Sequence, residues 1–333
     1  MLTQNAGKTE KLFYIERGKA DYDEVATIPE EYLPFIMPYA GVYFQNDNEC
    51  EIISQHRKVG PFSIWVQEVL AREDLILCPY TPEPIWALHF MYETSVDVEL
   101  YKGNNFALDE RECNLFNLEP VIHRVPMTKG QRLLSCHINI LPKDLKKLAA
   151  KYPALRCLAD KKSAGVTAPL NTHPYHTNSV CSYLLQNMLL CRHIEVPADH
   201  FLYRICLDLF LNFARQDQQL PMRFLDLLHN DELNLLFRVV TEAPHHNFSL
   251  DQLCELAALS PKVLQDGFDR NYSIAVEDFT LMVKMIMVFE LLTKKDTPLS
   301  AIAMAAGYKN WQSLNRAFKK YYGCELEELR RAM

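Results

Sequence analysis

Gln312, Ser313 and Arg316 lie within about one helical turn of each other near the end of the chain. On the exposed face of a helix, glutamine can pair bidentately with adenine and arginine with guanine in the major groove of DNA. Leu314 and Phe318 are expected to face inward, because apolar residues of such a helix belong to the core. The chemistry offered at this spacing is therefore the reading of base edges.

Basic and polar side chains surround this set. We expect Lys309, Lys319 and Lys320 to contact phosphates, and Asn310 to cap the helix and donate to phosphate as well. Trp311 is expected to pack on a sugar or on a thymine methyl group. These residues would hold the base-reading set in register on a duplex.

A helix-turn-helix must position these side chains. Ser300 is expected to open a helix through Ile302 and Met304, Gly307 to end it in the left-handed conformation, and Asn310 to cap the next helix, WQSLNRAFKKYY. The resulting turn of three to four residues suits two helices that cross steeply, of which the second enters the major groove.

A similar unit precedes this one. FSLDQLCELAALSPKVLQDGFDRNY has Ser249 as its expected first cap and restarts at Ser260-Pro261, which is typical of a helix start. The apolar face of its first helix is expected to contain three leucines, Leu250, Leu253 and Leu256. The sequence therefore predicts two helix-turn-helix units.

Charge separates the two units. Residues 247–280 contain two basic residues against six acidic ones, whereas residues 293–324 contain six basic residues against one acidic one. The whole chain has a formal net charge of −7, which argues against a nucleic-acid partner unless positive charge is clustered. The second unit alone is expected to grip phosphate.

These residues resemble the DNA-binding domain of the AraC/XylS family of bacterial transcription regulators. The family pattern I-A-x-x-x-G-F, then R-x-F-K-K-x-x-G, is matched at Ile302-Ala303, Gly307-Tyr308, Arg316, Phe318-Lys319-Lys320 and Gly323. The resemblance covers residues 247–333. It implies a seven-helix domain in which FTLMVKMIMVFELL joins the two units, with double-stranded promoter DNA and RNA polymerase as partners.

The first unit departs from the family pattern. Asp266 stands where members commonly carry a basic residue, and Ser273 stands where a glycine is usual. Lys262 and Gln265 remain as candidate DNA contacts. Phosphate repels a carboxylate, although aspartate can accept from cytosine. Whether this unit contacts DNA is therefore left open.

Residues 1–141 are expected to form a β-rich domain. Short runs of β-branched and aromatic residues alternate with turn residues, which is typical of a barrel or sandwich. This region resembles, more loosely, the cupin-like sensory half of the same regulators, which implies a small-molecule effector. The candidate effector-binding residues lie on two expected strands: Trp86, His89, Ser135, His137 and Asn139. The alternatives are a solvent face and histidines satisfied in the core.

Residues 142–246 are expected to be a helical region for coupling or dimerisation, ending at the linker TEAPHHN. An apolar stripe suits either packing onto the barrel or a homodimer contact: Phe201, Ile205, Leu209 and Phe213. The fold class predicted is thus α+β multidomain, with a β-rich cupin-like amino-terminal domain, a helical linker region and an all-α domain over residues 247–333.

No metal and no cofactor are expected. His173 and His176, and the adjacent His245 and His246, are not joined by carboxylates or cysteines in a ligand pattern. The β region lacks the paired HxH motif of metal-binding cupins, and the sequence contains no glycine-rich phosphate loop and no recognisable catalytic triad. An enzyme that uses the barrel cavity is therefore the least favoured hypothesis.

Ten scattered cysteines without a CxxC pair indicate reduced thiols and a cytoplasmic protein. No secretion signal is recognisable, and no segment has the ~20 uninterrupted apolar residues of a membrane span, so no membrane contact is expected. The sequence predicts a sequence-specific transcription regulator controlled by an effector. The alternative is a regulator that has a degenerate first helix-turn-helix, has lost most sequence-specific binding and acts mainly through protein contacts. The effector, the operator, the sign of regulation and the oligomeric state are left open.

Overall fold

The computed structural model describes residues 13–15, 28–93, 96–100, 104–163, 165–171, 173–219, 229–294 and 297–332. The chain divides into two compact units. The sheet unit comprises Met1–Thr177 with Leu189–Arg192, and the helical unit comprises Asn178–Met188 with His193–Met333. The predicted class, a β-rich domain followed by an all-helical one, is confirmed. The domain boundaries predicted at 141 and 246 stay predictions.

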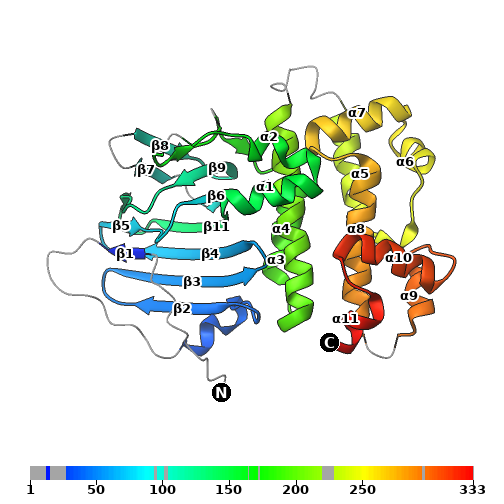
Figure 1. Cartoon of the computed structure of the whole chain (residues 1–333), viewed down its shortest axis with the longest axis horizontal. Coiled ribbons are helices and arrows are strands. Elements are labelled where there is room, and N and C mark those ends of the chain that lie inside the picture. Colours follow the sequence, from blue (N-terminus) through cyan, green and yellow to red (C-terminus); the bar gives the residue numbers. More distant parts are fainter. Residues whose placement is uncertain are drawn as a thin grey trace. The chain divides into compact units, whose positions relative to one another are not determined.

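The sheet unit is built on a large antiparallel sheet with the strand order β12-β9-β6-β11-β4-β3-β2 (Figure 1). The bounds are β2 Gly41–Asn46, β3 Cys50–Val59, β4 Phe62–Ala71, β6 Ile85–Glu93, β9 Glu112–Leu118, β11 Arg132–Ile140 and β12 Ala168–Pro169, and β13 Tyr175–His176 also pairs with β9. A smaller sheet contains β1 Phe13–Ile15, β5 Leu75–Pro79 and β10 Val125–Met127, and β7 Val96–Leu100 pairs with β8 Asn104–Leu108. The β-rich region predicted over residues 1–141 is confirmed, because β1 to β11 all lie within it.

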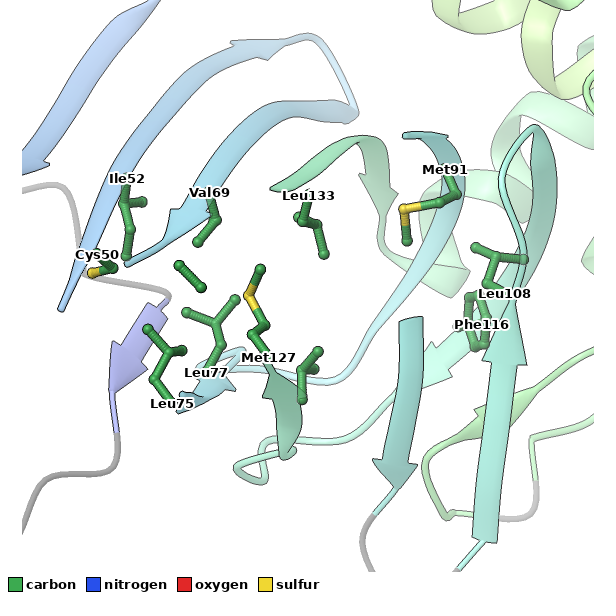
Figure 2. Close-up of a cluster of buried hydrophobic side chains, with 12 residues drawn as sticks. Cys50, Ile52, Val69, Leu75, Leu77, Met91, Leu108, Phe116, Met127 and Leu133 are labelled. Carbon is green, nitrogen blue, oxygen red and sulfur yellow. The ribbon is translucent and has the colours of Figure 1, made fainter. Parts of the chain in front are cut away.

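An apolar core joins the large sheet to the small one (Figure 2). Ile52 of β3, Val69 of β4 and Leu133 of β11 belong to one buried cluster with Leu77 of β5 and Met127 of β10. Ile52 and Val69 are paired directly across β3 and β4, so their side chains lie on the same face of the sheet. The unit is completed by α1 Pro142–Lys151, η2 Pro153–Leu155, α2 Arg156–Ala159 and the short η1 Glu30–Phe35.

The segment of residues 160–178, inside the region expected to be helical, contains two short strands. Ala168–Pro169 and Tyr175–His176 both pair with β9, and Thr167 is buried, with its hydroxyl oxygen accepting from the backbone N–H of Glu119 at 3.0 Å. The many Pro, Thr and Ser residues of this segment do not predict a strand. An edge strand can nevertheless form there, because it needs only a few backbone hydrogen bonds and little β propensity.

The helical unit begins with α3 Ser179–Leu190 and α4 Glu195–Gln218, followed by α5 Asn230–Glu242. The remaining helices are α6 Leu250–Ala257, α7 Pro261–Tyr272, α8 Val276–Leu292, α9 Leu299–Ala305, α10 Trp311–Tyr322 and α11 Leu326–Ala332 (Figure 1). Helix α5 lies within the helical region expected over residues 142–246, and residues 220–228 before it lie outside the described residues. Among the described helices, none is long and apolar enough to cross a membrane.

The apolar stripe expected on α4 is buried: Phe201, Ile205, Leu209 and Phe213 are each at most 2% exposed. Within the helical unit, Phe201 contacts Phe289 of α8, with ring centroids 5.0 Å apart. This stripe is thus covered inside a single chain. Since these four side chains are buried, they offer no exposed surface for the homodimer contact that was one of the two expected uses of the stripe.

Helix α5 packs on the first helix-turn-helix unit. A Cβ atom added to Gly267 of α7 would lie 2.8 Å from a methyl group of Leu233, so the absent side chain permits the close approach of the two helices. The Tyr272 hydroxyl donates to Oδ1 of Asn234 at 2.7 Å, and the ring of Phe237 stacks on Phe279 of α8. The seven helices implied by the resemblance are reached only when α5 is counted with α6 to α11.

Candidate nucleic-acid interface

The first helix of the second unit begins one residue earlier than expected. Pro298 is the N-cap of α9 and Ser300 lies inside the helix, so the prediction that Ser300 opens it is wrong. Ile302 is buried as expected, but Met304 is 75% exposed. The buried positions are Ile302, Ala303 and Ala306, and two residues along a helix from Ile302 the side chain points away from this face.

The turn between α9 and α10 has the predicted chemistry. Gly307 adopts a φ of 74°, in the left-handed region that favours glycine. The N–H of Tyr308 donates to the carbonyl oxygen of Ala303 at 2.8 Å, which satisfies a terminal carbonyl of α9. Oδ1 of Asn310 accepts from the N–H of Ser313 at 2.9 Å, so Asn310 is confirmed as the cap of α10.

Helix α10 separates a core face from an exposed face. Leu314 and Phe318 are fully buried, as expected. Gln312 and Arg316 are exposed one turn apart, and the half-buried Ser313 lies beside them, with its hydroxyl oxygen 3.5 Å from Nη2 of Arg316. The three base-reading candidates therefore share one side of a capped helix.

The expected phosphate contacts lie at both ends of α10. Lys309 and Asn310 are exposed before its first turn, Lys319 and Lys320 are exposed in its last turns, and Trp311 is half-buried. Nζ of Lys319 lies 2.7 Å from Oε1 of Glu325, and this hydrogen bond raises the pKa of Lys319. In the described part of the chain, Lys309, Arg316 and Lys320 have no ion pair. Lys319 alone of this set is partly neutralised by a neighbouring acid.

The first unit has both predicted caps. The Ser249 hydroxyl accepts from the N–H of Gln252, whose side chain accepts from the N–H of Ser249, and the Ser260 hydroxyl accepts from the N–H of Val263. One of the three leucines predicted on the apolar face of α6 is wrong. Leu253 and Ala257 are buried, whereas Leu256 is 51% exposed. The spacing from Leu253 to Ala257 is one helical turn, and Leu256 falls outside that face.

The exposed face of α7 is short of DNA donors. Lys262, Gln265, Asp266 and Asp269 are all exposed. Nε2 of Gln265 already donates to Oε1 of Glu277 at 3.0 Å, so one of the two contact candidates is engaged by an acid. Ser273, where a glycine is usual in the family, ends the helix at a φ of 55°. The exposed basic residues of α7 are Lys262 and Arg270, and they stand beside the two carboxylates Asp266 and Asp269.

The candidate effector residues do not all lie together. His89, Ser135, His137 and Asn139 lie on one face of the large sheet, because Asn139 pairs with Ala87 and His137 with His89. Trp86 lies on the other face, where its Nε1 donates to Oδ1 of Asn117 at 3.1 Å. Trp86 and His89 are three residues apart on one strand, so alternation alone excludes a shared face. The prediction that placed Trp86 with this group is wrong.

An aromatic row crosses the sheet at His137. In register across neighbouring strands lie His56 of β3, Trp65 of β4, His137 of β11 and His89 of β6. The rings of His56 and Trp65 stack with centroids 4.1 Å apart, and those of His89 and His137 with centroids 5.5 Å apart. His56 and Trp65 are not predicted as members of this row, because the register between two strands cannot be read from the pattern of one strand alone.

Burial keeps this row uncharged. Burial lowers the pKa of His89 to about 4, and burial together with Lys58 and Arg57 lowers the pKa of His56 to about 4. Burial, and then the neighbouring His89 and His56, hold the pKa of His137 well below its usual range. Several buried polar atoms on this face have no hydrogen-bond partner among the described residues: His89 Nε2, His137 Nδ1, Ser135 Oγ and Asn139 Oδ1.

A cavity in the sheet unit lies elsewhere. It has a volume of about 300 Å³ and is lined by Tyr32, Phe35, Glu51, Ile53, Glu68, Leu70 and Arg132. Ile53 and Glu68 alternate with Ser54 and Gln67, so this cavity opens on the face opposite the aromatic row. No group of three or more potential metal ligands is found among the described residues.

The helix-turn-helix geometry is matched by known proteins. Residues 253–332 match the family described as a helix-turn-helix domain. An uncharacterised HTH-type transcriptional regulator of Haemophilus influenzae is 24% identical over 132 residues, which are 40% of this chain and 44% of that protein. The chain thus spans less than half the length of this relative. Residues 253–332 are a helix-turn-helix domain, and the resemblance to AraC/XylS regulators is confirmed for this region.

Two solved structures are also similar to parts of this chain. The carboxy-terminal domain of AraT, a response regulator from Geobacillus stearothermophilus, is 21% identical with a TM-score of 0.29, over 31% of this chain and 85% of that one. ToxT from Vibrio cholerae is 12% identical with a TM-score of 0.31, over 81% of this chain and 98% of that one. These TM-scores are too low to transfer any property of either protein to this chain.

Proposed function

We propose that the chain is a transcription regulator that binds promoter DNA through its second helix-turn-helix unit. The observation that carries this proposal is the exposed face of α10, where Gln312, Ser313 and Arg316 stand together on a capped helix. Bidentate pairing by glutamine and arginine requires such a rigid, exposed presentation. Regulation of transcription without catalysis, in the cytoplasm, and with RNA polymerase as a further partner, belongs to the same proposal.

The first unit has a different role in this proposal. Its exposed carboxylates, Asp266 and Asp269, and the engagement of Gln265 by Glu277 oppose a strong grip on phosphate. It therefore reads DNA weakly, beside a second unit that supplies most of the affinity. The second candidate function, a regulator that acts mainly through protein contacts, is favoured by the same acidic face.

Effector control is the third part of the proposal. The aromatic row presents neutral imidazoles and an indole, and the unpartnered donors and acceptors beside it can bind a polar molecule. An uncharged ligand suits this face, because burying a charge without a partner is costly. The effector acts by binding one arrangement of the chain more tightly than another.

A selection of bound sites from random duplex DNA tests the proposal. The full chain should enrich a defined sequence, and its affinity for that sequence should fall steeply with salt because lysine and arginine contacts release counterions. Binding that ignores both sequence and salt concentration would overturn DNA reading and leave the protein-contact alternative. A panel of small uncharged molecules, scored by the shift of thermal unfolding with and without His137→Leu, tests the effector site separately.

A further inference from the structure

Helix α4 carries a second stripe that is polar and buried. Arg204, Asp208, Asn212 and Gln216 follow one another at intervals of four residues, so they share one face of the helix. The side chains of Arg204 and Asp208 are 15% and 10% exposed, and Asn212 and Gln216 are 4% and 9% exposed. Buried polar groups are costly unless they are hydrogen-bonded, so the partners of this polar stripe identify its role.

One end of the polar stripe holds the carboxyl end of α7. Nδ2 of Asn212 donates to the carbonyl oxygen of Tyr272 at 2.7 Å and to that of Ser273 at 3.3 Å. Oδ1 of Asn212 accepts from Nδ2 of Asn178 and from Nε2 of Gln216, each at 2.9 Å. Nδ2 of Asn178 also donates to Tyr272 at 3.2 Å. Carbonyls that the end of a helix leaves free are thereby satisfied by side chains of α4 and of the segment before α3.

The other end of the polar stripe holds the carboxyl end of α10. The Arg204 guanidinium lies over the ring of Tyr321, with its carbon 3.8 Å from the ring centroid, and Nη1 lies 3.4 Å from the carbonyl oxygen of Tyr321. The Tyr321 hydroxyl donates to Oδ2 of Asp208 at 2.6 Å, and Asp208 pairs with Arg204. A cation beside the carboxyl end of a helix interacts favourably with the helix dipole.

The two reading helices are thus attached to one rigid element. Arg204 and Asn212 stand about 12 Å apart along α4, since each residue of a helix rises about 1.5 Å. Helix α8 joins the two helix-turn-helix units covalently. The polar stripe adds a second, noncovalent connection at the carboxyl ends of α7 and α10. Two connections between the same pair of bodies restrict their rotation, which a single connection leaves freer.

We propose that α4, which precedes the helix-turn-helix domain in the chain, is a positioning element that fixes the distance and rotation between the two reading helices. The polar stripe then makes the protein select one spacing between the DNA segments facing α7 and α10. This inference rests on the proposed DNA binding. Arg204, Asp208 and Asn212 are positioning residues, because they contact the ends of the reading helices and not their exposed faces.

The test replaces the charged half of the stripe with apolar side chains. In Arg204→Met/Asp208→Leu the packing volume is largely kept and the attachment to Tyr321 is lost; exchanging a buried ion pair for apolar residues is often neutral for stability. The matched control is Arg215→Met, which removes an ion pair of α4 with Asp278 at 3.1 Å and leaves the polar stripe intact. Thermal unfolding of both variants verifies that they are folded.

Binding is measured on the selected DNA site and on versions with one to five base pairs inserted between its two segments. The full chain and the Arg215→Met control should discriminate strongly among the spacings. The double variant should lose about tenfold in affinity for the best spacing, because the effective concentration of the second contact falls, and its dependence on spacing should flatten. A folded double variant with the spacing dependence of the unaltered chain would overturn the proposal.

Hydrogen exchange without DNA separates this proposal from the proposed function. Amides in the last turn of α10 should exchange faster in the double variant than in the control, because the attachment at Tyr321 is gone. If no DNA sequence is enriched at all, the proposed function fails and the exchange measurement alone decides. Faster exchange in that turn then supports the attachment, and unchanged exchange overturns it.

Discussion

The side chain of Asn247 fills the space beside Gly307: a Cβ atom added to Gly307 would lie 2.3 Å from Cγ of Asn247. Asn247 ends the linker before the first unit, and Gly307 forms the turn of the second. Both residues have a positive φ, 47° and 74°. The linker is therefore packed against the turn of the distant unit, which explains why glycine is required at position 307 for two separate reasons.

Gly307→Ala should destabilise the helical unit by about 2 to 4 kcal/mol. The left-handed conformation costs an alanine about 1 kcal/mol, and the overlap with Asn247 adds the cost of overpacking, about 1 to 3 kcal/mol. Gly323→Ala is the matched control, since Gly323 has a φ of 81° but no atom within 4 Å of an added Cβ. Chemical unfolding of both variants measures the difference; equal losses would show that Asn247 yields without cost.

Arg316→Ala should weaken binding to the selected DNA site by about 1 to 3 kcal/mol and relax the preference at one base position. The physical reason is the loss of a bidentate pair with a guanine. Arg331→Ala is the control, because Arg331 is also exposed but lies on α11 and pairs with Glu327 at 3.5 Å. A site selection repeated with each variant reads the preference, and an unchanged preference would remove Arg316 from the base-reading set.

Glu325→Gln should tighten DNA binding at low salt. The hydrogen bond between Lys319 and Glu325 also holds the pKa of Glu325 below its usual range, so this acid is charged at neutral pH. Its removal frees Lys319 for a phosphate, and the slope of log affinity against log salt should steepen by up to about 0.9. Glu327→Gln, which removes a charge whose partner is Arg331, should leave that slope nearly unchanged.

Asp266→Arg should tighten DNA binding if α7 faces the groove. The exchange replaces a repelled carboxylate with a phosphate ligand, and the salt slope should steepen by about 1 for one added contact. Asp231→Arg makes the same change of charge at an exposed position of α5 and controls for net charge. Equal effects of the two variants would mean that α7 is turned away from the duplex.

Features fixed by neighbouring residues could be predicted from the sequence. The caps at Ser249, Ser260 and Asn310 and the buried pair Leu314 and Phe318 depend on contacts within one helix or turn, and all are confirmed. Features that depend on distant partners could not be predicted. A polar residue at every fourth position of α4 predicts a solvent-exposed face. The burial of this face depends on distant partners such as Tyr272, which lies 60 residues after Asn212 in the sequence.

In the sheet unit, the features that depend on one strand could be predicted, and those that depend on the register between strands could not. The face shared by Ser135, His137 and Asn139 follows from alternation along a single strand, and the pairing of β11 with β6 agrees with it. The stack of His56 on Trp65 needs the register between β3 and β4, which local pattern does not define. The sequence alone excludes Trp86 from the face that carries His89, because the two residues are an odd number of positions apart on the same strand.

Acid should destabilise the sheet unit through its histidines. Burial lowers the pKa of His89 from 6.5 to about 4, so between these values the unfolded chain binds a proton that the folded chain does not. Stability therefore falls as the pH decreases from about 6.5 to about 4, by up to about 1.4 kcal/mol per pH unit for each such histidine. Unfolding followed at several pH values should show a shallower dependence in His89→Leu than in the unaltered chain. His246→Gln, at an exposed position of the linker, should not change it. A His89→Leu chain with the full acid sensitivity would show that the proton is taken up elsewhere.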